Sequence, residues 1–211
     1  MTFFRKLLRR RPKSVLVISA ALLWGLYTLV RPADIVALTI GEPYEQVRQR
    51  TRTTLPPGHL GHYAGGYVER PSILRFTDPQ FGFVTPAAKR LFVGYDKHGN
   101  VDSVTMWPQT KLLPLDETLK VVTDLQRQFR QGGWCLENAA KFPAIEDTPA
   151  MREKMRSLPG PTSYWQGGDK LKASIDVFRM HRDSRPNDER FQITLRLYKS
   201  SDAGCCMKDM H

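Results

Sequence analysis

The feature that most constrains this chain is an uncharged apolar segment of 17 residues, 14–30, bounded by Lys13 and Arg31. At about 1.5 Å per residue, a helix over this segment spans about 25 Å, near the lower limit for crossing a bilayer. The charged side chains at its ends can reach the headgroups. Six basic residues and no acidic residue precede the segment. The positive-inside rule therefore places residues 1–13 in the cytoplasm and residues 31–211 across the membrane.

Two other interpretations of residues 14–30 stay open, a cleaved signal peptide and a helix buried in a globular core. The segment is longer than the usual apolar region of a signal peptide. The residues after it form a poor cleavage site, because Ile35 stands two positions before Ala37 and Arg31 two before Ala33. No cysteine suited to lipid attachment follows it. We therefore expect an uncleaved, single-pass signal anchor in a bacterial inner membrane, with the lipid bilayer as its partner and a periplasmic domain after it.

Composition and charge narrow the classes of function. The chain is 41% hydrophobic and 25% charged, which is typical of a globular protein and argues against wholesale disorder or several membrane spans. The formal net charge of +11 invites a nucleic-acid interpretation. Outside the basic N-terminal segment, however, 26 Lys and Arg stand against 21 Asp and Glu. We therefore expect no nucleic-acid partner.

The first half of the predicted domain contains one short helix, a loop and a hairpin. Glu42, Pro43 and Glu45 suit the start of a helix over residues 41–50, because proline and acidic side chains favour a first turn. The Gly/Pro-rich stretch that follows is expected to be a loop. The predicted elements are a helix over 41–50, a loop over 54–72, a strand over 73–76 and a hairpin of 90–96 with 101–107.

The strongest helix signal in the chain covers residues 116–131, where apolar side chains recur every three or four positions. Asp116 is expected to cap its start, and Gly132–Gly133 to end it. A shorter helix is expected to begin at Thr148–Pro149.

Two runs near the end of the chain alternate strictly between apolar and polar residues. They predict strands over 171–177 and 191–197, each with one buried and one hydrated face, joined by a polar loop over 181–190. Together these elements predict an α+β fold for residues 31–211, with an antiparallel sheet, two or three helices packed on one face, and a flexible tail from about residue 200. No internal repeat is evident.

Aromatic side chains are the candidate partner-binding residues. Trp107, Tyr164 and Trp165 could line a groove, because aromatic rings supply large contact areas at low entropic cost. Core packing is the alternative interpretation. The chain has no nucleophile elbow, zinc-protease, phosphate-loop or dinucleotide motif, and the acidic pairs at 116–117 and 188–189 have structural explanations. We therefore expect no catalytic residues, no enzymatic activity and no cofactor.

The cysteines suggest an oxidised protein. Cys135, Cys205 and Cys206 all follow the predicted anchor, and disulfides persist in oxidising compartments. A bridge from Cys135 to Cys205 or to Cys206 leaves one thiol over. A free Cys135 in the core is the alternative.

Soft and imidazole ligands suggest a metal site, with a solvated loop and a frayed terminus as the alternative. Cysteine, methionine and histidine together suit copper or zinc. The candidate ligands are His59, His62, Cys205, Cys206, Met207, Met210 and His211.

Two resemblances bear on function. Residues 39–107, with a short helix, a Gly/Pro loop and a hairpin containing Asp96-x-x-Gly99-x-Val101, resemble the small lipoproteins of the outer-membrane barrel-assembly machinery. This chain lacks their lipidated cysteine. The whole plan, a signal anchor followed by a compact periplasmic α+β domain, resembles immunity proteins that neutralise secreted antibacterial effectors. That resemblance implies a protein partner.

These observations lead to one expected function and two alternatives. We expect a non-catalytic, membrane-anchored periplasmic domain that binds a protein, such as an immunity protein acting on a secreted effector. The first alternative is a cell-envelope assembly or scaffold protein. The second is periplasmic handling of copper or zinc by the tail.

Overall fold

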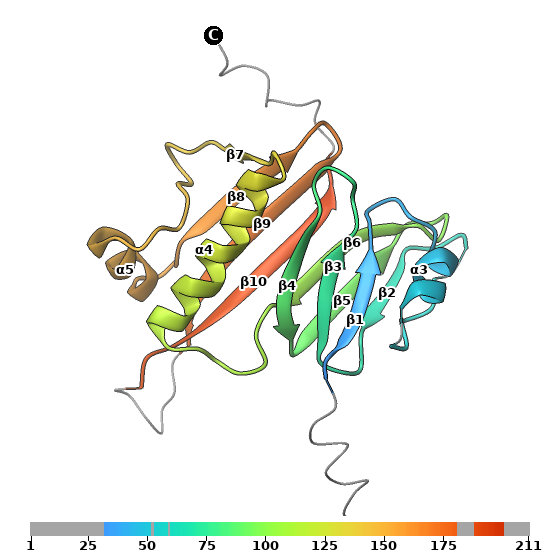
Figure 1. Cartoon of the computed structure of the whole chain (residues 1–211), viewed down its shortest axis with the longest axis horizontal. Coiled ribbons are helices and arrows are strands. Elements are labelled where there is room, and N and C mark those ends of the chain that lie inside the picture. The colour runs from blue at the N-terminus through green and yellow to red at the C-terminus, as the bar shows by residue number, and fades with distance from the viewer. Residues whose placement is uncertain (1–31, 52, 59, 181–187, 201–211) are drawn as a thin grey trace, which may run out of the picture. The chain divides into compact units, whose positions relative to one another are not determined.

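The computed structural model describes residues 32–51, 53–58, 60–180 and 188–200. The chain divides into two compact units, Met1–Pro32 and Ala33–His211, and every strand and helix described belongs to the second (Figure 1). The predicted anchor, residues 14–30, lies outside the described residues. Within the described part of the chain, no helix is both long and apolar enough to span a bilayer.

The larger of two sheets has seven antiparallel strands, in the spatial order β2-β5-β6-β10-β9-β8-β7. In each half of the sheet, strands that come later in the chain lie closer to the centre. The two halves meet where β6 pairs with β10. The strands are β2 (Ala64–Tyr67), β5 (Arg90–Tyr95), β6 (Val101–Trp107), β7 (Cys135–Glu137), β8 (Thr162–Gly167), β9 (Leu171–Met180) and β10 (Arg190–Lys199).

The smaller sheet has three strands in the order β1-β3-β4. Strand β1 (Asp34–Leu38) runs parallel to β3 (Ser72–Phe76), which pairs antiparallel with β4 (Phe83–Ala88). Three helices are described, α3 (Tyr44–Arg50), α4 (Leu115–Gln131) and α5 (Pro149–Arg156).

Helix α4 begins one residue earlier than the sequence suggests, and Asp116 does not cap it. Pro114 occupies the N-cap position, and no side chain caps the helix there. Asp116 instead lies in the first turn and forms an ion pair with Arg152 of α5. The predicted end is confirmed, with Gly132 at the C-cap and Gly133 at φ +77°. Helix α5 begins where the sequence predicts, at Pro149 after the N-cap residue Thr148. The Thr148 hydroxyl caps this start by accepting a hydrogen bond from Met151 N at 3.2 Å.

Helix α4 and the three-stranded sheet lie side by side on one face of the seven-stranded sheet (Figure 1). An aromatic cluster joins all three. The Phe129 ring of α4 lies 4.9 Å from Phe83 of β4 and 5.5 Å from Trp165 of β8, and it stacks on Trp134 at 5.1 Å. All four side chains are buried. The core is therefore a single apolar layer, with the seven-stranded sheet on one side and helix α4 and the three-stranded sheet on the other.

The α+β prediction is confirmed, as are the hairpin of β5 with β6, the helix α4 and the strands β9 and β10. The prediction of one sheet is wrong, because the three-stranded sheet forms part of the cover. The predicted loop over 54–72 contains β2, whose sequence Ala-Gly-Gly-Tyr carries almost no strand signal.

Candidate functional site

The seven-stranded sheet has an inner face, covered by α4 and the smaller sheet, and an outer face that carries the candidate site. Along β9 the side chains of Leu171, Ala173, Ile175 and Val177 are buried in the core. Their neighbours at even positions therefore point to the outer face. Strand register places one row of outer side chains across the sheet: Glu137, Tyr164, Ser174, Arg196, Thr105, Phe92 and Tyr67.

The centre of the outer face is polar and internally paired. The Asp176 carboxylate accepts hydrogen bonds from Thr162 Oγ1 at 2.7 Å, from Ser174 Oγ at 3.4 Å and from Arg196 Nη1 at 2.5 Å. Asp176 is 6% exposed and Ser174 only 2%. The charge of Asp176 is therefore balanced within the sheet itself. We call Asp176 and its partners Thr162, Ser174 and Arg196 the polar floor of the outer face.

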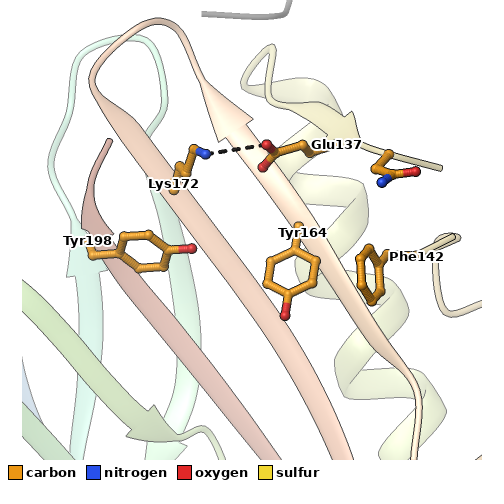
Figure 2. Close-up of a pocket in the computed structure, with 6 residues that line it drawn as sticks. Glu137, Phe142, Tyr164, Lys172 and Tyr198 are labelled. Carbon is orange, nitrogen blue, oxygen red and sulfur yellow. Dashed lines mark hydrogen bonds and ion pairs between the residues drawn. The ribbon is translucent and has the colours of Figure 1, made fainter. Parts of the chain in front are cut away.

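An aromatic depression of about 270 Å³ lies beside this floor, over β7 to β10 (Figure 2). Phe142 stands edge-on to Tyr164, with ring centroids 4.7 Å apart. Lys172 Nζ lies 3.3 Å from Glu137 Oε1 at one end of the depression. Figure 2 shows the Tyr198 hydroxyl pointing towards the side of the depression that Tyr164 occupies. Aromatic walls with an ion pair at the rim can hold a planar or amphipathic group of a partner.

Burial raises the pKa of Tyr198 above its ordinary value of 10.0, because the phenolate would lose hydration there. The Tyr198 hydroxyl therefore stays neutral in the physiological range. As a neutral phenol it can donate one hydrogen bond to a bound group and also accept one.

A second aromatic cluster lies at the other edge of the outer face. The Arg90 guanidinium stands 5.3 Å from the Tyr67 ring and 5.1 Å from the Trp107 ring. The Tyr67 ring is also edge-on to Phe92 at 5.4 Å. Tyr67 is 58% exposed. The Arg90 guanidinium therefore lies between the Tyr67 and Trp107 rings at the surface and makes a cation–π contact with each.

The structure separates the three predicted partner-binding aromatics. Tyr164 and Trp107 are half-buried on the outer face, one in each cluster. Trp165 is 1% exposed and lies in the core against Phe129. Its indole Nε1 donates to Ser163 Oγ at 3.0 Å. Trp165 therefore belongs to the core and not to the surface.

Most of the predicted metal ligands and two of the three cysteines lie outside the part of the chain that the structure describes. His62 is exposed, whereas His59 and the tail ligands Cys205, Cys206, Met207, Met210 and His211 lie outside the described residues. Within the part of the chain that is described, no three His, Cys, Asp or Glu side chains cluster to hold a metal. Cys135 is disulfide-bonded. The alternative of a free Cys135 is therefore wrong, and its pairing with Cys205 or with Cys206 stays a prediction.

The sequence patterns missed several side chains of the depression. Tyr198 continues the alternation of β10 by one residue beyond the predicted strand. Extending the alternation to Tyr198 would have placed its side chain on the outer face. Glu137 lies on a strand of three residues, and Phe142 comes from the segment after it. Nothing in their local pattern shows that they meet Tyr164.

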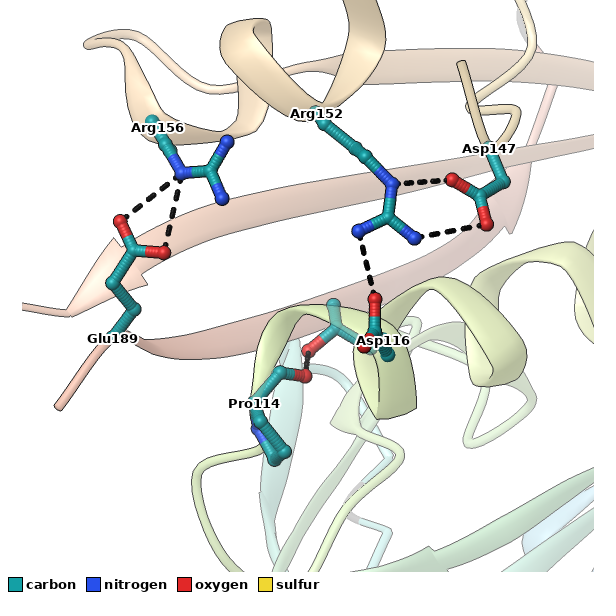
Figure 3. A network of polar contacts seen from close by, with 7 residues as sticks. Pro114, Asp116, Asp147, Arg152, Arg156 and Glu189 are labelled. Carbon is teal, nitrogen blue, oxygen red and sulfur yellow. Dashed lines mark hydrogen bonds and ion pairs between the residues drawn. The ribbon is translucent and has the colours of Figure 1, made fainter. Parts of the chain in front are cut away.

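A separate polar network joins α5 to its neighbours away from the outer face (Figure 3). Arg152 donates to Asp147 Oδ1 at 2.6 Å and lies 2.8 Å from Asp116 Oδ1. Arg156 pairs with Glu189 at 3.1 Å. These contacts hold α5 against the start of α4 and the start of β10, which is a structural role.

The outer face therefore offers two aromatic clusters on either side of a paired polar floor. Comparison with protein-family models, with curated proteins and with solved structures finds no match to this chain.

Proposed function

We propose that this chain is a non-catalytic protein-binding domain, held at the bacterial inner membrane by residues 14–30, that binds a protein in the periplasm. The observation that carries this proposal is the outer face of the seven-stranded sheet, with its aromatic depression and its paired polar groups. The binding site is the aromatic depression over β7 to β10 together with the polar floor around Asp176. The partner is a secreted effector in the immunity interpretation and an envelope-assembly protein in the scaffold interpretation.

The size of the outer face supports a protein partner. From Glu137 on β7 to Phe92 on β5 the row crosses six strands, or about 24 Å at the usual strand spacing. Strand β6 has seven residues, or about 23 Å of length. The product, roughly 550 Å², approaches the roughly 800 Å² that one partner contributes to a standard interface.

The chemistry of the face supports the same proposal. Tyrosine, tryptophan and arginine are enriched where proteins bind one another, and Tyr164, Tyr198 and Arg196 all lie on this face. Lys172 and Asp176 are each paired with an opposite charge. A partner therefore covers these pairs without leaving a lone buried charge.

Two features support a periplasmic location. Six basic residues precede the apolar segment, which opposes their transfer across the membrane. The disulfide at Cys135 is the kind of bond that persists outside the cytoplasm.

Photocrosslinking in living cells tests the proposal. The photoreactive amino acid p-benzoylphenylalanine replaces Tyr164 or Tyr198 in the depression, or, as controls, Glu117 or Lys120 on the exposed side of α4. We expect one protein adduct of defined mass from both sheet positions and none from the helix positions. Adducts from the helix positions alone, or no adduct from any position in any growth condition, would contradict the proposal.

A second measurement asks whether the depression sets the affinity. Once mass spectrometry has identified the partner, Tyr198→Ala should weaken binding about tenfold or more, because a central aromatic anchor is often worth more than about 1.4 kcal/mol. Lys120→Ala should leave it unchanged. A secreted antibacterial effector as partner supports the immunity interpretation, and an envelope component supports the scaffold interpretation.

A further inference from the structure

The end of the domain at which β1 begins carries basic and aromatic side chains together. Asp34 pairs in register with Ser72, and Ser72 with Ala88. These pairs place the starts of β1 and β3 beside the end of β4, and β5 begins two residues after that end, at Arg90. The basic and aromatic side chains around this end are Tyr67, Arg70, Lys89, Arg90, Trp107 and Lys111. We call this set the β1-start surface.

Ion-pair, hydrogen-bond and cation–π contacts link the residues of this surface. Arg70 Nη1 lies 3.7 Å from Asp34 Oδ2. Lys89 N donates to Gln109 O at 2.9 Å, and Gln109 Nε2 donates to Lys111 O at 3.0 Å. Arg90 pairs in register with Trp107 and stands between its ring and that of Tyr67.

We propose that the β1-start surface lies against the bilayer and binds the headgroups of anionic phospholipids. The proposal rests on the anchor of the proposed function. From Val30, the end of that anchor, to Asp34 the chain has four residues, which span at most about 14 Å when fully extended. The start of β1 must then lie within that distance of the membrane interface, and the side chains around it lie closest to the headgroups.

Charge and side-chain type fit this occupant. The surface has four basic side chains, one of which, Arg70, pairs with Asp34. Lys89, Arg90 and Lys111 are exposed. Basic side chains near a membrane are attracted to anionic lipids, and tryptophan and tyrosine prefer the headgroup level. Trp107 therefore serves the membrane end of the outer face, while Tyr164 serves the protein site.

Edge strand β2 and the residue before it supply a matched pair of positions for the test. Tyr63 and Tyr67 are both exposed, at 76% and 58%. They are four residues apart, or about 13 Å along an extended chain, and Tyr67 is the one beside Arg90. Position 67 lies on the β1-start surface, and position 63 lies towards the opposite end of the sheet.

The experiment uses the full chain reconstituted into phosphatidylcholine vesicles with or without phosphatidylglycerol. The photoreactive residue p-benzoylphenylalanine replaces Tyr67 in one chain and Tyr63 in the other, and mass spectrometry measures the phospholipid adducts. We expect position 67 to form at least about fivefold more lipid adduct than position 63, and more with phosphatidylglycerol than without. Equal yields, a protein adduct instead of a lipid adduct at position 67, or no effect of phosphatidylglycerol would overturn the inference.

Charge variants test the recognition itself. Lys89→Gln with Arg90→Gln and Lys111→Gln should lower the lipid adduct at position 67 at least about fivefold in phosphatidylglycerol vesicles. The matched control is Lys97→Gln with Lys170→Gln and Lys199→Gln, three exposed lysines outside this surface, which should leave it unchanged. Equal losses in the two triple variants would overturn the inference.

Alkaline extraction of the same vesicles separates this inference from the proposed function. A chain that remains in the bilayer but forms no lipid adduct at position 67 overturns the lipid surface alone. A chain that extraction releases has no anchor, and both proposals then fail.

Discussion

The buried hydroxyl of Tyr95 is a polar group without a hydrogen-bond partner among the described residues. Tyr95 is 1% exposed, and its ring is edge-on to Tyr44 at 5.4 Å. Burial raises the pKa of the Tyr95 phenol, since the phenolate would lose its hydration in the core. A neutral hydroxyl without a partner still costs free energy, because it gives up its hydrogen bonds to water on folding.

Tyr95→Phe should therefore raise the free energy of unfolding by about 1 kcal/mol, measured by urea denaturation of the full chain in detergent. The contrast is Thr85→Val. Thr85 is 3% exposed, and its Oγ1 accepts from Leu74 N at 3.1 Å, so its loss should lower the free energy of unfolding by about 1 kcal/mol or more. Two changes of the same sign would contradict this account.

The second prediction at this scale concerns the carboxyl group of Asp147. Its hydrogen bonds from Arg152 hold its pKa below the ordinary value of 3.8. The pairing is therefore fully present above that value and is lost as the pH falls through the lowered pKa. A carboxyl titration followed by NMR should show a midpoint below 3.8. Arg152→Gln should return it towards that value, and Arg156→Gln should not.

At the scale of elements, two glutamines of α4 hold neighbouring segments by imitating a peptide group. Gln126 Nε2 donates to Ile145 O at 2.7 Å, and Ile145 N donates to Gln126 Oε1 at 2.9 Å. Gln128 does the same with Val84 of β4, at 3.0 and 2.9 Å. Helix α4 thereby occupies the edge of β4, where a sheet would otherwise expose unpaired backbone groups.

The two glutamines differ in burial, which predicts unequal costs of substitution. Gln126 is 0% exposed, whereas Gln128 is half-buried. Gln126→Leu should lower the free energy of unfolding by about 2–4 kcal/mol, because both Ile145 groups lose their partner away from water. Gln128→Leu should cost about 1 kcal/mol or less, because water can reach Val84. Unfolding in urea measures both, and equal costs would contradict the interpretation.

How far the sequence predicts the elements depends on their side chains. Strands β9 and β10 are readable because apolar residues occupy every second position. Strand β8 is not, since its apolar core contact is Trp165 and its other buried members are small or polar. Strand β1 was not predicted, because it directly follows the predicted anchor, although its Ile35 and Val36 favour a strand. Edge strands and short strands are fixed by tertiary contacts that no local pattern records.

The site was predictable only in part, for a related reason. Tyr164 and Trp165 are adjacent, and adjacent residues of a strand point to opposite faces. The prediction that both residues line one groove is therefore wrong, because β8 places them on opposite faces of the sheet. The outward positions Lys172, Ser174 and Asp176 follow from alternation alone. Their meeting with Glu137 and Arg196 depends on strand order, which local patterns do not record.

At the scale of the whole molecule, the strongest prediction concerns topology. Alkaline phosphatase, which is active only after export, should be active when fused after His211. A fluorescent reporter that matures only in the cytoplasm should stay dark there. The physical reason is the basic block before residues 14–30, which resists transfer across an energised membrane. Swapping that block to the far side of the segment is the control, and it should reverse the two signals.

Strand order also fixes when this domain can be completed as its chain emerges. Strand β10 comes last among the described strands, yet it lies inside the sheet between β6 and β9. Until it arrives, β2-β5-β6 and β9-β8-β7 are two separate groups of three, each with an open edge where β10 belongs. In a chain that leaves a membrane from its N-terminal side, the seven-stranded sheet therefore cannot form until β10 has emerged. Until then the exposed edges of β6 and β9 can pair with wrong strands.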